Sequence, residues 1–168
     1  MKELSELPDF PGRGPGFDPD TWHLRVDGLV EGSLSLTFAQ VQALPSEEDT
    51  SPFECVEGWR VDGNQWQGVA VATVLDLAGP MPQARYATFH AGDFIMSLSL
   101  EEARAPGVLL AHSLGGAPLP PEHGAPLRLV VPGKDCFYGV KWVERVELTI
   151  EVRDTGKEIA LARVRRQA

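Results

Sequence analysis

Turn-forming residues recur at such short intervals along this chain that long helices and strands are excluded. The sequence contains 14 prolines and 17 glycines among 168 residues. Proline removes a backbone hydrogen-bond donor, and glycine weakens the interior of helices and strands. We therefore expect many short elements joined by turns, within a single domain large enough to enclose its own core.

Alternation of apolar and polar residues predicts strands in several segments between these turns. Segment 22–27 alternates through Trp22, Leu24 and Val26, as a half-buried strand does. Segment 146–152 alternates in the same way, and its apolar side chains are expected on one face. Further strands are expected at 34–36, on either side of a turn at Gly92 within 86–100, and at 107–114, 127–131 and 140–146.

Two short helices are expected between the strands. Thr37 is a predicted N-cap, Gln40 completes a capping box with it, and Pro45 ends the first helix. Segment 71–78 has apolar residues at helical spacing before a stop at Gly79. Strands outnumber helices, so the predicted class is α+β, with mixed, mainly antiparallel sheets and short helices.

The charge balance argues against nucleic acid as a partner. The chain has 24 acidic and 15 basic residues, a net charge of −9, whereas nucleic-acid binders need a cationic footprint on phosphates. The N-terminal stretch MKELSELPDF lacks the continuous apolar core of a secretory signal, and no segment is long and apolar enough to span a membrane. The sequence therefore predicts a cytoplasmic protein without a membrane span.

The sequence contains two cysteines, Cys55 in the stretch PFECVEGWR and Cys136 far along the chain. In a reducing compartment they are expected to be core residues or reactive thiols instead of a structural disulfide. Zinc is a poor explanation, because C-x-x-C and paired histidine spacings are missing. From the residues alone, Cys55 is either a buried inert thiol or the nucleophile of a cysteine hydrolase with His123 as its base.

A cluster of cations lies among the turns of segment 120–142. Arginine offers a planar fork to phosphate oxygens, lysine offers a point charge, and nearby glycines allow the backbone to approach a ligand closely. The cluster is therefore either an anion site or a solvated basic face. Its members are His123, Arg128, Lys134 and Lys141.

Four sequence blocks occur in a fixed order: FECVEGWRVDGNQWQGV, ATVLDLAGP, LLAHSLGGAPLPPEHGAPLRLVVPG and VKWVERVEL. Their cysteine turn, H-G-x-P-L-R-L-V-V-P-G block and V-K-W block resemble the molybdopterin-binding domain of the sulfite oxidase family, including its small stand-alone prokaryotic members. The resemblance covers about 22–150 and implies the fold of that family. It divides the chain into an irregular N-terminal segment, 1–21, a molybdopterin-binding oxidoreductase domain, 22–152, and a C-terminal tail, 153–168.

The resemblance implies a molybdenum-molybdopterin cofactor. In that family the cysteine of this turn gives its thiolate to molybdenum, and Cys55 is the matching position. Soft sulfur ligands suit a metal that changes its oxidation state. Cys136 falls where relatives have a turn residue, so no ligand role is expected for it. The residues that match the family's cofactor-binding positions are Asp93, His123, Arg128, Gly139, Val140 and Lys141.

The implied activity is transfer of an oxygen atom to or from a small substrate, such as sulfite, a sulfoxide or another small oxyanion. Arg60 matches an arginine near the oxyanion site of sulfite oxidases, and Tyr138 is expected to donate a hydrogen bond near the reacting oxygen. The sequence departs from the family pattern in two places, of which the first weakens a sulfite assignment. The stretch FPGRGPGF replaces the family's F-x-x-R-N-H segment and leaves only Arg13, and DCFYG replaces a Y-G-Y-K-S-like run.

The haem and dimerisation domains of animal sulfite oxidases have no counterpart in the sequence. A separate electron-transfer protein is therefore the expected redox partner. The two departures keep an alternative open, in which the chain is a binding module that retains the fold without redox turnover.

Overall fold

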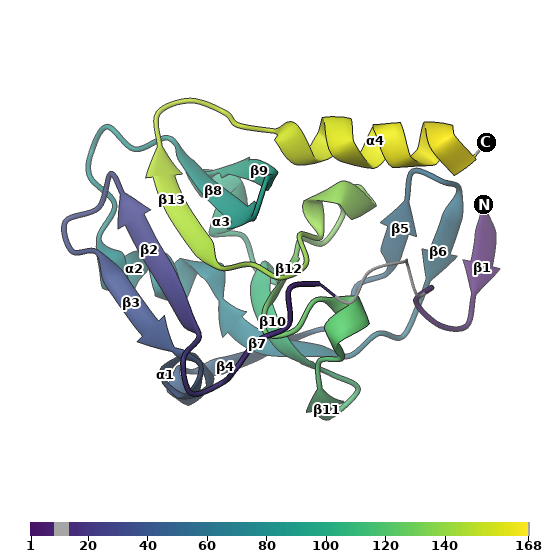
Figure 1. Cartoon of the computed structure of the whole chain (residues 1–168), viewed down its shortest axis with the longest axis horizontal. Coiled ribbons are helices and arrows are strands. Elements are labelled where there is room, and N and C mark those ends of the chain that lie inside the picture. Colours follow the sequence, from purple (N-terminus) through teal and green to yellow (C-terminus); the bar gives the residue numbers. More distant parts are fainter. Residues whose placement is uncertain (9–13, 168) are drawn as a thin grey trace.

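The computed structural model describes residues 1–8 and 14–167, and its strands form three sheets (Figure 1). The predicted α+β class with mixed, mainly antiparallel sheets is confirmed. One five-stranded sheet has the order β3-β2-β13-β8-β9, in which β13 pairs parallel with β2 and antiparallel with β8. Its strands are β2 (His23–Gly28), β3 (Leu34–Thr37), β8 (Tyr86–Ala91), β9 (Phe94–Ser99) and β13 (Arg145–Thr149).

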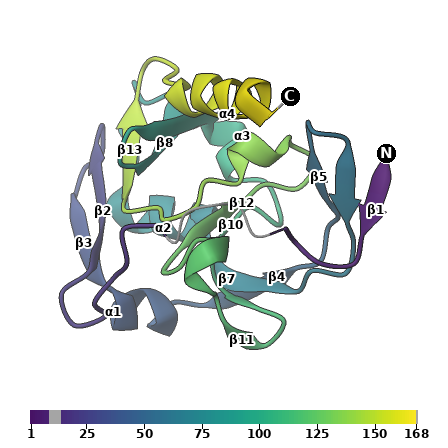
Figure 2. The same ribbon diagram turned by 45° about the vertical axis from the view of Figure 1, so that its right-hand side comes forward.

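The second sheet has the order β11-β10-β7-β4, with β12 paired to β10. The third sheet is a β5–β6 hairpin extended by β1, and both ribbon views place it at the opposite end of the molecule from β2 and β3 (Figures 1 and 2). The strands of these two sheets are β1 (Lys2–Leu4), β4 (Ser46–Asp49), β5 (Phe53–Cys55), β6 (Trp59–Val61), β7 (Trp66–Ala70), β10 (Leu109–Leu114), β11 (Ala117–Pro118) and β12 (Arg128–Val130).

The two predicted helices are confirmed with their capping signals. The Thr37 side chain accepts from the Gln40 amide at 3.1 Å, and the Gln40 side chain accepts from the Thr37 amide at 2.9 Å, so the capping box is complete. Gly79 ends the second helix with a φ of 70°. The described helices are α1 (Phe38–Ala43), α2 (Val71–Ala78), α3 (Leu100–Ala103) and α4 (Thr155–Gln167), with 3-10 turns η1 (Pro121–His123) and η2 (Cys136–Tyr138).

Buried apolar side chains form two groups. The main core lies between the five-stranded sheet, α2 and the loop before β13, and its largest fully buried members include Phe89, Leu75 and Leu148. The second group lies between the β5–β6 hairpin, β7 and β10, and we call it the hairpin cluster. It consists of Leu7, Cys55, Trp59, Val61, Trp66, Ala70, Leu109, Ala111, Leu119, Ala125 and Val130.

The structure corrects the strands expected near the C-terminal end. Segment 140–144 has no strand, and β13 ends at Thr149 because its antiparallel partner β8 begins at the paired Tyr86. Beyond that point Ile150 and Val152 are 57% and 50% exposed, although the alternation predicted them on the buried face. The sequence pattern continues, but no neighbouring strand remains to pair with it.

Both terminal segments contain regular secondary structure. The N-terminal segment 1–21 is predicted to be irregular, which is wrong for Lys2–Leu4, because this stretch pairs in parallel with β6 as β1. Within the C-terminal tail 153–168, residues Thr155–Gln167 form α4, which packs against β9 and η2. The predicted site residue Arg13 lies outside the described residues.

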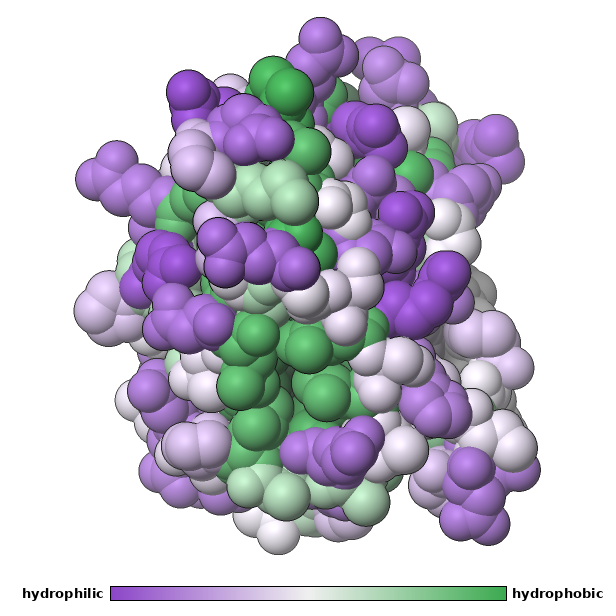
Figure 3. All heavy atoms as spheres, turned by 90° about the vertical axis from the view of Figure 1, so that its left-hand side faces the viewer, coloured by the Kyte–Doolittle hydropathy of each residue, from purple (hydrophilic) through white to green (hydrophobic). Residues whose placement is uncertain are grey.

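The face formed by the β2 and β3 end carries a continuous apolar area bordered by hydrophilic side chains (Figure 3). This face lies away from the β5–β6 hairpin (Figures 1 and 2). Among the described helices, none combines the length and the apolar character that crossing a bilayer requires.

Candidate functional site

Cys55 ends strand β5 and points into the hairpin cluster. Its cross-strand partner is Trp59, and both side chains are buried. Between them the chain reverses at Gly58, whose φ of 86° is disfavoured for residues with a side chain. Phe53, two positions earlier on the same strand, stacks on Trp59 with ring centroids 5.8 Å apart. The hairpin register therefore places the thiol on the buried face that also carries the Phe53–Trp59 stack.

Cys136 packs against the hairpin cluster that contains Cys55, although 80 residues separate the two cysteines in the sequence. Their elements, β5 and η2, lie against each other. The interaction of the two thiols lowers the pKa of Cys136 and raises the pKa of Cys55. Both cysteines are free thiols.

Arg128 places a buried cation beside this pair. Its side chain begins on β12 and is 4% exposed, with the guanidinium carbon 4.9 Å from the ring centroid of Phe53 and 5.1 Å from that of Trp66. Nη1 donates to the His123 carbonyl at 3.2 Å, whereas Nε has no hydrogen-bond partner among the residues that the structure describes. No described carboxylate forms an ion pair with it, and burial lowers its pKa to about 10.

A close approach between two loops brings His123 and Lys141 to the same place. Lys141 Nζ donates to the Glu122 carbonyl at 2.6 Å, and Trp142 Nε1 donates to the Pro121 carbonyl at 2.8 Å. Gly124 makes the approach possible, because a Cβ there would lie 3.0 Å from Lys141 Cα at a φ of +116°. The predicted cofactor residues His123, Arg128 and Lys141 are therefore neighbours.

Gly139 follows η2 and packs directly against the arginine. A Cβ at this position would lie 3.2 Å from Arg128 Nη2, 3.2 Å from the Cys136 carbonyl oxygen and 3.3 Å from Phe53 Cε2. Val140 is buried in the main core, and its carbonyl accepts from the Leu129 amide at 2.9 Å. Glycine therefore gives the guanidinium room, and Val140 anchors this loop to the core.

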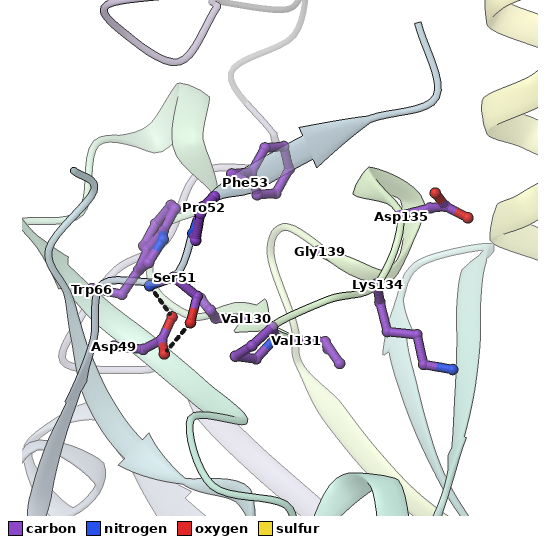
Figure 4. Close-up of a pocket in the computed structure, with 11 residues that line it drawn as sticks. Asp49, Ser51, Pro52, Phe53, Trp66, Val130, Val131, Lys134, Asp135 and Gly139 are labelled. Carbon is purple, nitrogen blue, oxygen red and sulfur yellow. Dashed lines mark hydrogen bonds between the residues drawn. The ribbon is translucent and has the colours of Figure 1, made fainter. Parts of the chain in front are cut away.

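A shallow pocket opens beside Gly139 (Figure 4). Phe53, Pro52 and Trp66 lie on one side of it, and the loop that carries Lys134 and Gly139 lies on the other. Two hydrogen bonds, from the amide and the hydroxyl of Ser51 to the Asp49 carboxylate at 3.0 and 2.9 Å, fix the chain just before β5. The pocket therefore borders the same aromatic pair that encloses Arg128.

The structure does not bring Arg60 together with Cys55. Arg60 is paired across the hairpin with Glu54, on the face opposite the buried Cys55 and Trp59. It forms ion pairs with Glu54 at 3.3 Å and Asp62 at 2.7 Å. The geometry therefore gives no support to the substrate-side role that the resemblance implied for this arginine.

Tyr138 and Asp93 have no described contact with Cys55, although Tyr138 shares the turn η2 with Cys136. The Tyr138 ring packs on the main core, with Lys134 Nζ 5.1 Å from its centroid. Asp93 is exposed in the β8–β9 turn, where its carbonyl accepts from the Thr155 hydroxyl at 2.6 Å. Among the described contacts, neither residue meets Cys55, so their predicted roles are not supported by this geometry.

The comparison with known families decides the identity of this arrangement. The family described as “Oxidoreductase molybdopterin binding domain” matches residues 11–156. The chain belongs to this family. The predicted resemblance to sulfite oxidase-type molybdopterin-binding domains is thereby confirmed.

Relatives and a solved structure agree with membership in the molybdopterin-binding family. The chain is 37% identical to the uncharacterized oxidoreductase YuiH of Bacillus subtilis over 80% of this chain and 68% of that protein. It is 34% identical to the protein-methionine-sulfoxide reductase catalytic subunit MsrP of Gluconobacter oxydans, over 79% of this chain and 48% of that protein. The chain therefore spans about half the length of MsrP.

The crystal structure of the sulfane dehydrogenase SoxCD from Paracoccus pantotrophus superimposes with a TM-score of 0.76 and 26% identity, covering 82% of this chain and 40% of that chain. This agreement extends the family match from sequence to fold. The comparison covers less than half of the SoxCD chain.

The described residues fit the molybdopterin cofactor of the family. A phosphate needs an enclosed cation with a free donor, and Arg128 Nε is buried without a hydrogen-bond partner. A soft metal needs a thiol, and Cys55 lies two residues along β5 from Phe53, the ring under the arginine. The predicted site residues do not include Phe53, Trp66 or Cys136. Phe53 and Trp66 are distant from Arg128 in the sequence, and Cys136 is distant from Cys55, so only the fold brings these residues together.

Proposed function

We propose that this chain binds the molybdenum-molybdopterin cofactor and transfers an oxygen atom to or from a small sulfur compound, of the sulfoxide or sulfite type. The observation that carries the proposal is Arg128, a buried cation near Cys136 that has no carboxylate partner among the described residues and whose Nε has no described hydrogen-bond partner. Burying such a charge is costly unless an anion completes the site. An anionic cofactor with a thiolate-bound metal satisfies both groups at once.

Each residue then has a defined task. Cys55 supplies the thiolate to molybdenum, and Arg128 Nε donates to an anionic oxygen of the pterin phosphate. His123 and Lys141 place further polar groups at the same end of the site, held by η1 and the Glu122 carbonyl. When bound, the cofactor supplies a metal that changes oxidation state and accepts or releases the oxygen atom.

The proposed substrate class is based on the activities for which the relatives are named. MsrP is named for methionine sulfoxide and SoxCD for sulfane, so both names point to sulfur chemistry. We extend this chemistry to the present chain and propose that electrons travel to or from a separate protein. The cytoplasmic location stays a prediction, which fractionation of cells producing the natural protein would test.

A second function is favoured by one observation. Arg60 is turned to the outer face of the hairpin and Tyr138 lies at the main core, so neither residue proposed for the substrate is beside Cys55. A binding module that holds the cofactor without turnover would need neither residue. Cofactor content separates both functions from a cysteine hydrolase, which is disfavoured because the described partners of Cys55 are Cys136 and the Glu57 amide, not an imidazole.

The test is metal and pterin analysis of protein produced in cells that synthesise the cofactor. The natural chain is expected to carry molybdenum in proportion to protein and to show a visible absorption band that bleaches on reduction. Cys55→Ser is expected to lose the band and most of the metal, because an alcohol is a poor ligand for a soft metal. Glu54→Gln, on the outer face of the same hairpin, is the matched control and should retain both.

Turnover is measured separately with methionine sulfoxide and a reduced viologen dye, and with sulfite and ferricyanide. Activity with either pair that is lost in Cys55→Ser supports the enzyme. A loaded protein without activity toward sulfoxides, sulfite or related small oxyanions would favour the binding module. Absence of both molybdenum and pterin from the natural chain would refute the proposed function altogether.

A further inference from the structure

The thiol pair has a feature that cofactor binding alone does not require. A metal needs one protein thiolate at this position, whereas the structure packs a second thiol, Cys136, against the hairpin cluster that contains Cys55. The two sulfur atoms come from different elements, β5 and η2, which pack against each other.

We propose that Cys55 and Cys136 form a reversible disulfide in the cofactor-free protein, and that this disulfide prevents the uptake of the cofactor. The blocking half of this proposal rests on the proposed function, since it requires that Cys55 is the molybdenum ligand. The disulfide itself depends only on the position of the two thiols. The packing of η2 against β5 brings the two cysteines to the same cluster, as a disulfide between them requires.

The two cysteines differ in their access to an oxidant. Cys55 is 7% exposed inside the hairpin cluster, whereas Cys136 is only partly buried at the start of η2. A peroxide in solution therefore meets Cys136 first. A neighbouring thiol within contact distance is the arrangement in which an oxidised cysteine is resolved as a disulfide before further oxidation.

The reaction balances with hydrogen peroxide as the oxidant. The Cys136 thiolate attacks one peroxide oxygen, the O–O bond breaks, and Cys136 becomes a sulfenic acid while hydroxide leaves and takes a proton to form water. The Cys55 sulfur then attacks the Cys136 sulfur, the S–S bond forms, and a second hydroxide leaves as water with the Cys55 proton. The two thiols together lose two electrons, which reduce the peroxide. A small dithiol reverses the step by thiol–disulfide exchange.

The consequence for the site is direct. In the disulfide, the Cys55 sulfur has no thiolate to offer, so a metal cannot be bound there. In the reduced pair the thiolate is available, and Cys136 remains beside the ligand. The oxidised form is therefore a protected, cofactor-free state that a thiol reductant returns to competence.

The first experiment measures the oxidation state of the two cysteines in the cofactor-free chain. Because the sequence contains two cysteines, thiol titration and intact mass report on this pair alone. After brief exposure to hydrogen peroxide we expect the free thiols to fall from two to none, with the mass of a monomer lacking two hydrogen atoms. Dithiothreitol should restore both thiols. Persistence of free thiols, gain of oxygen atoms instead, or a disulfide-linked dimer would overturn the disulfide.

The second experiment measures the uptake of the molybdenum cofactor. Reduced and peroxide-treated samples are incubated with molybdenum cofactor released from a cofactor-containing protein, and bound molybdenum is measured after gel filtration. The reduced chain should bind at least tenfold more molybdenum than the oxidised chain, and dithiothreitol should abolish the difference. Cys136→Ser should be insensitive to the same brief treatment, because Cys55 alone is shielded from the oxidant.

The possible outcomes distinguish the disulfide, the blocking of cofactor uptake and the proposed function. Equal uptake by the reduced and the disulfide forms would overturn the blocking. If neither form binds molybdenum while the mass still shows the disulfide, the proposed function fails and the blocking fails with it, whereas the thiol pair stands. A peroxide effect that Cys136→Ser retains in full would show that oxidation of Cys55 alone blocks uptake, which would also overturn the proposal.

Discussion

The five-stranded sheet and the hairpin cluster both bury polar groups, but only the sheet supplies partners for them. On the face of the sheet opposite the main core, the buried hydroxyl of Thr88 forms hydrogen bonds with those of Ser97 and Thr149, each at 2.9 Å. Beside the hairpin cluster, Arg128 is buried with an Nε that lacks a described partner. The sheet satisfies its own polar groups, whereas the site beside the hairpin cluster leaves a donor and a cation without a partner among the residues that the structure describes.

This difference has an energetic side. Burial lowers the pKa of Arg128 to about 10, so the folded chain holds its proton less tightly than the unfolded chain does. Keeping the cation at neutral pH therefore costs the folded state on the order of 3 kcal/mol. Contacts with the Phe53 and Trp66 rings offset part of this cost. The main core thus stabilises the fold, whereas Arg128 lowers stability in return for a binding site.

The largest expected effect tests the main core. Phe89 is fully buried, so Phe89→Ala removes a large ring and leaves a cavity. We expect the free energy of unfolding in urea to fall by about 3–5 kcal/mol. Leu77→Ala is the control, because Leu77 is also a large apolar residue but is 50% exposed on helix α2, and its replacement should change stability little. A small effect of Phe89→Ala would contradict the role of the main core as the source of stability.

The second prediction concerns Arg128, beside the hairpin cluster, where replacing a buried side chain is expected not to lower stability. Arg128→Met keeps most of the side-chain volume but removes the buried charge, so the cofactor-free protein should keep its stability or gain about 1–3 kcal/mol. The same change should remove most of the bound molybdenum and pterin, because the phosphate loses its cation. Urea unfolding and metal analysis measure the two effects. A loss of several kcal/mol with normal cofactor content would make Arg128 a structural residue.

A third, smaller effect is expected at Gly139. An added Cβ would crowd Arg128 Nη2 and the Cys136 carbonyl, both at 3.2 Å. Gly139→Ala should therefore cost about 1 kcal/mol and reduce cofactor content several-fold, since the guanidinium must shift. Gly32→Ala is the matched control, because a Cβ there meets nothing within 4 Å and the backbone is not left-handed. Equal behaviour of the two variants would show that the guanidinium position is not set by this contact.

The smallest effect is expected at Arg60. This side chain lies on the outer face of the hairpin, where it pairs with Glu54 and Asp62. Arg60→Ala should leave molybdenum content, pterin content and unfolding nearly unchanged, since exposed ion pairs contribute little. Metal analysis beside the natural chain checks this. A marked loss of cofactor in Arg60→Ala would restore the role that the family resemblance gave it.

Local signals predicted part of the fold well. The capping box of Thr37 and Gln40 and the stop at Gly79 are contained within a few residues, so the sequence located α1 and α2. The end of β13 depends on where its partner strand β8 begins. The alternation of apolar and polar residues continues through Ile150, so it could not predict this end. Helix α4 was missed because its residues show only a weak apolar stripe, and its packing on β9 is non-local.

The site divides in the same way. The family resemblance predicted cofactor-binding residues within its motif blocks, among them His123, Arg128 and Lys141. In the structure these three residues are neighbours, as predicted. The face of Arg60 depends on the hairpin register, which motif matching does not contain. The contact between Cys55 and Cys136 depends on the packing of β5 against η2, and no local pattern reveals it.

The most direct test of the cofactor site is X-ray absorption at the molybdenum edge of the loaded natural chain and of Cys55→Ser. If Cys55 gives its thiolate to the metal, the natural chain should show one more sulfur neighbour than whatever metal the variant retains. An unchanged number of sulfur neighbours in the variant, at equal molybdenum content, would show that the metal is held elsewhere and would contradict the assignment of the hairpin cluster as its site.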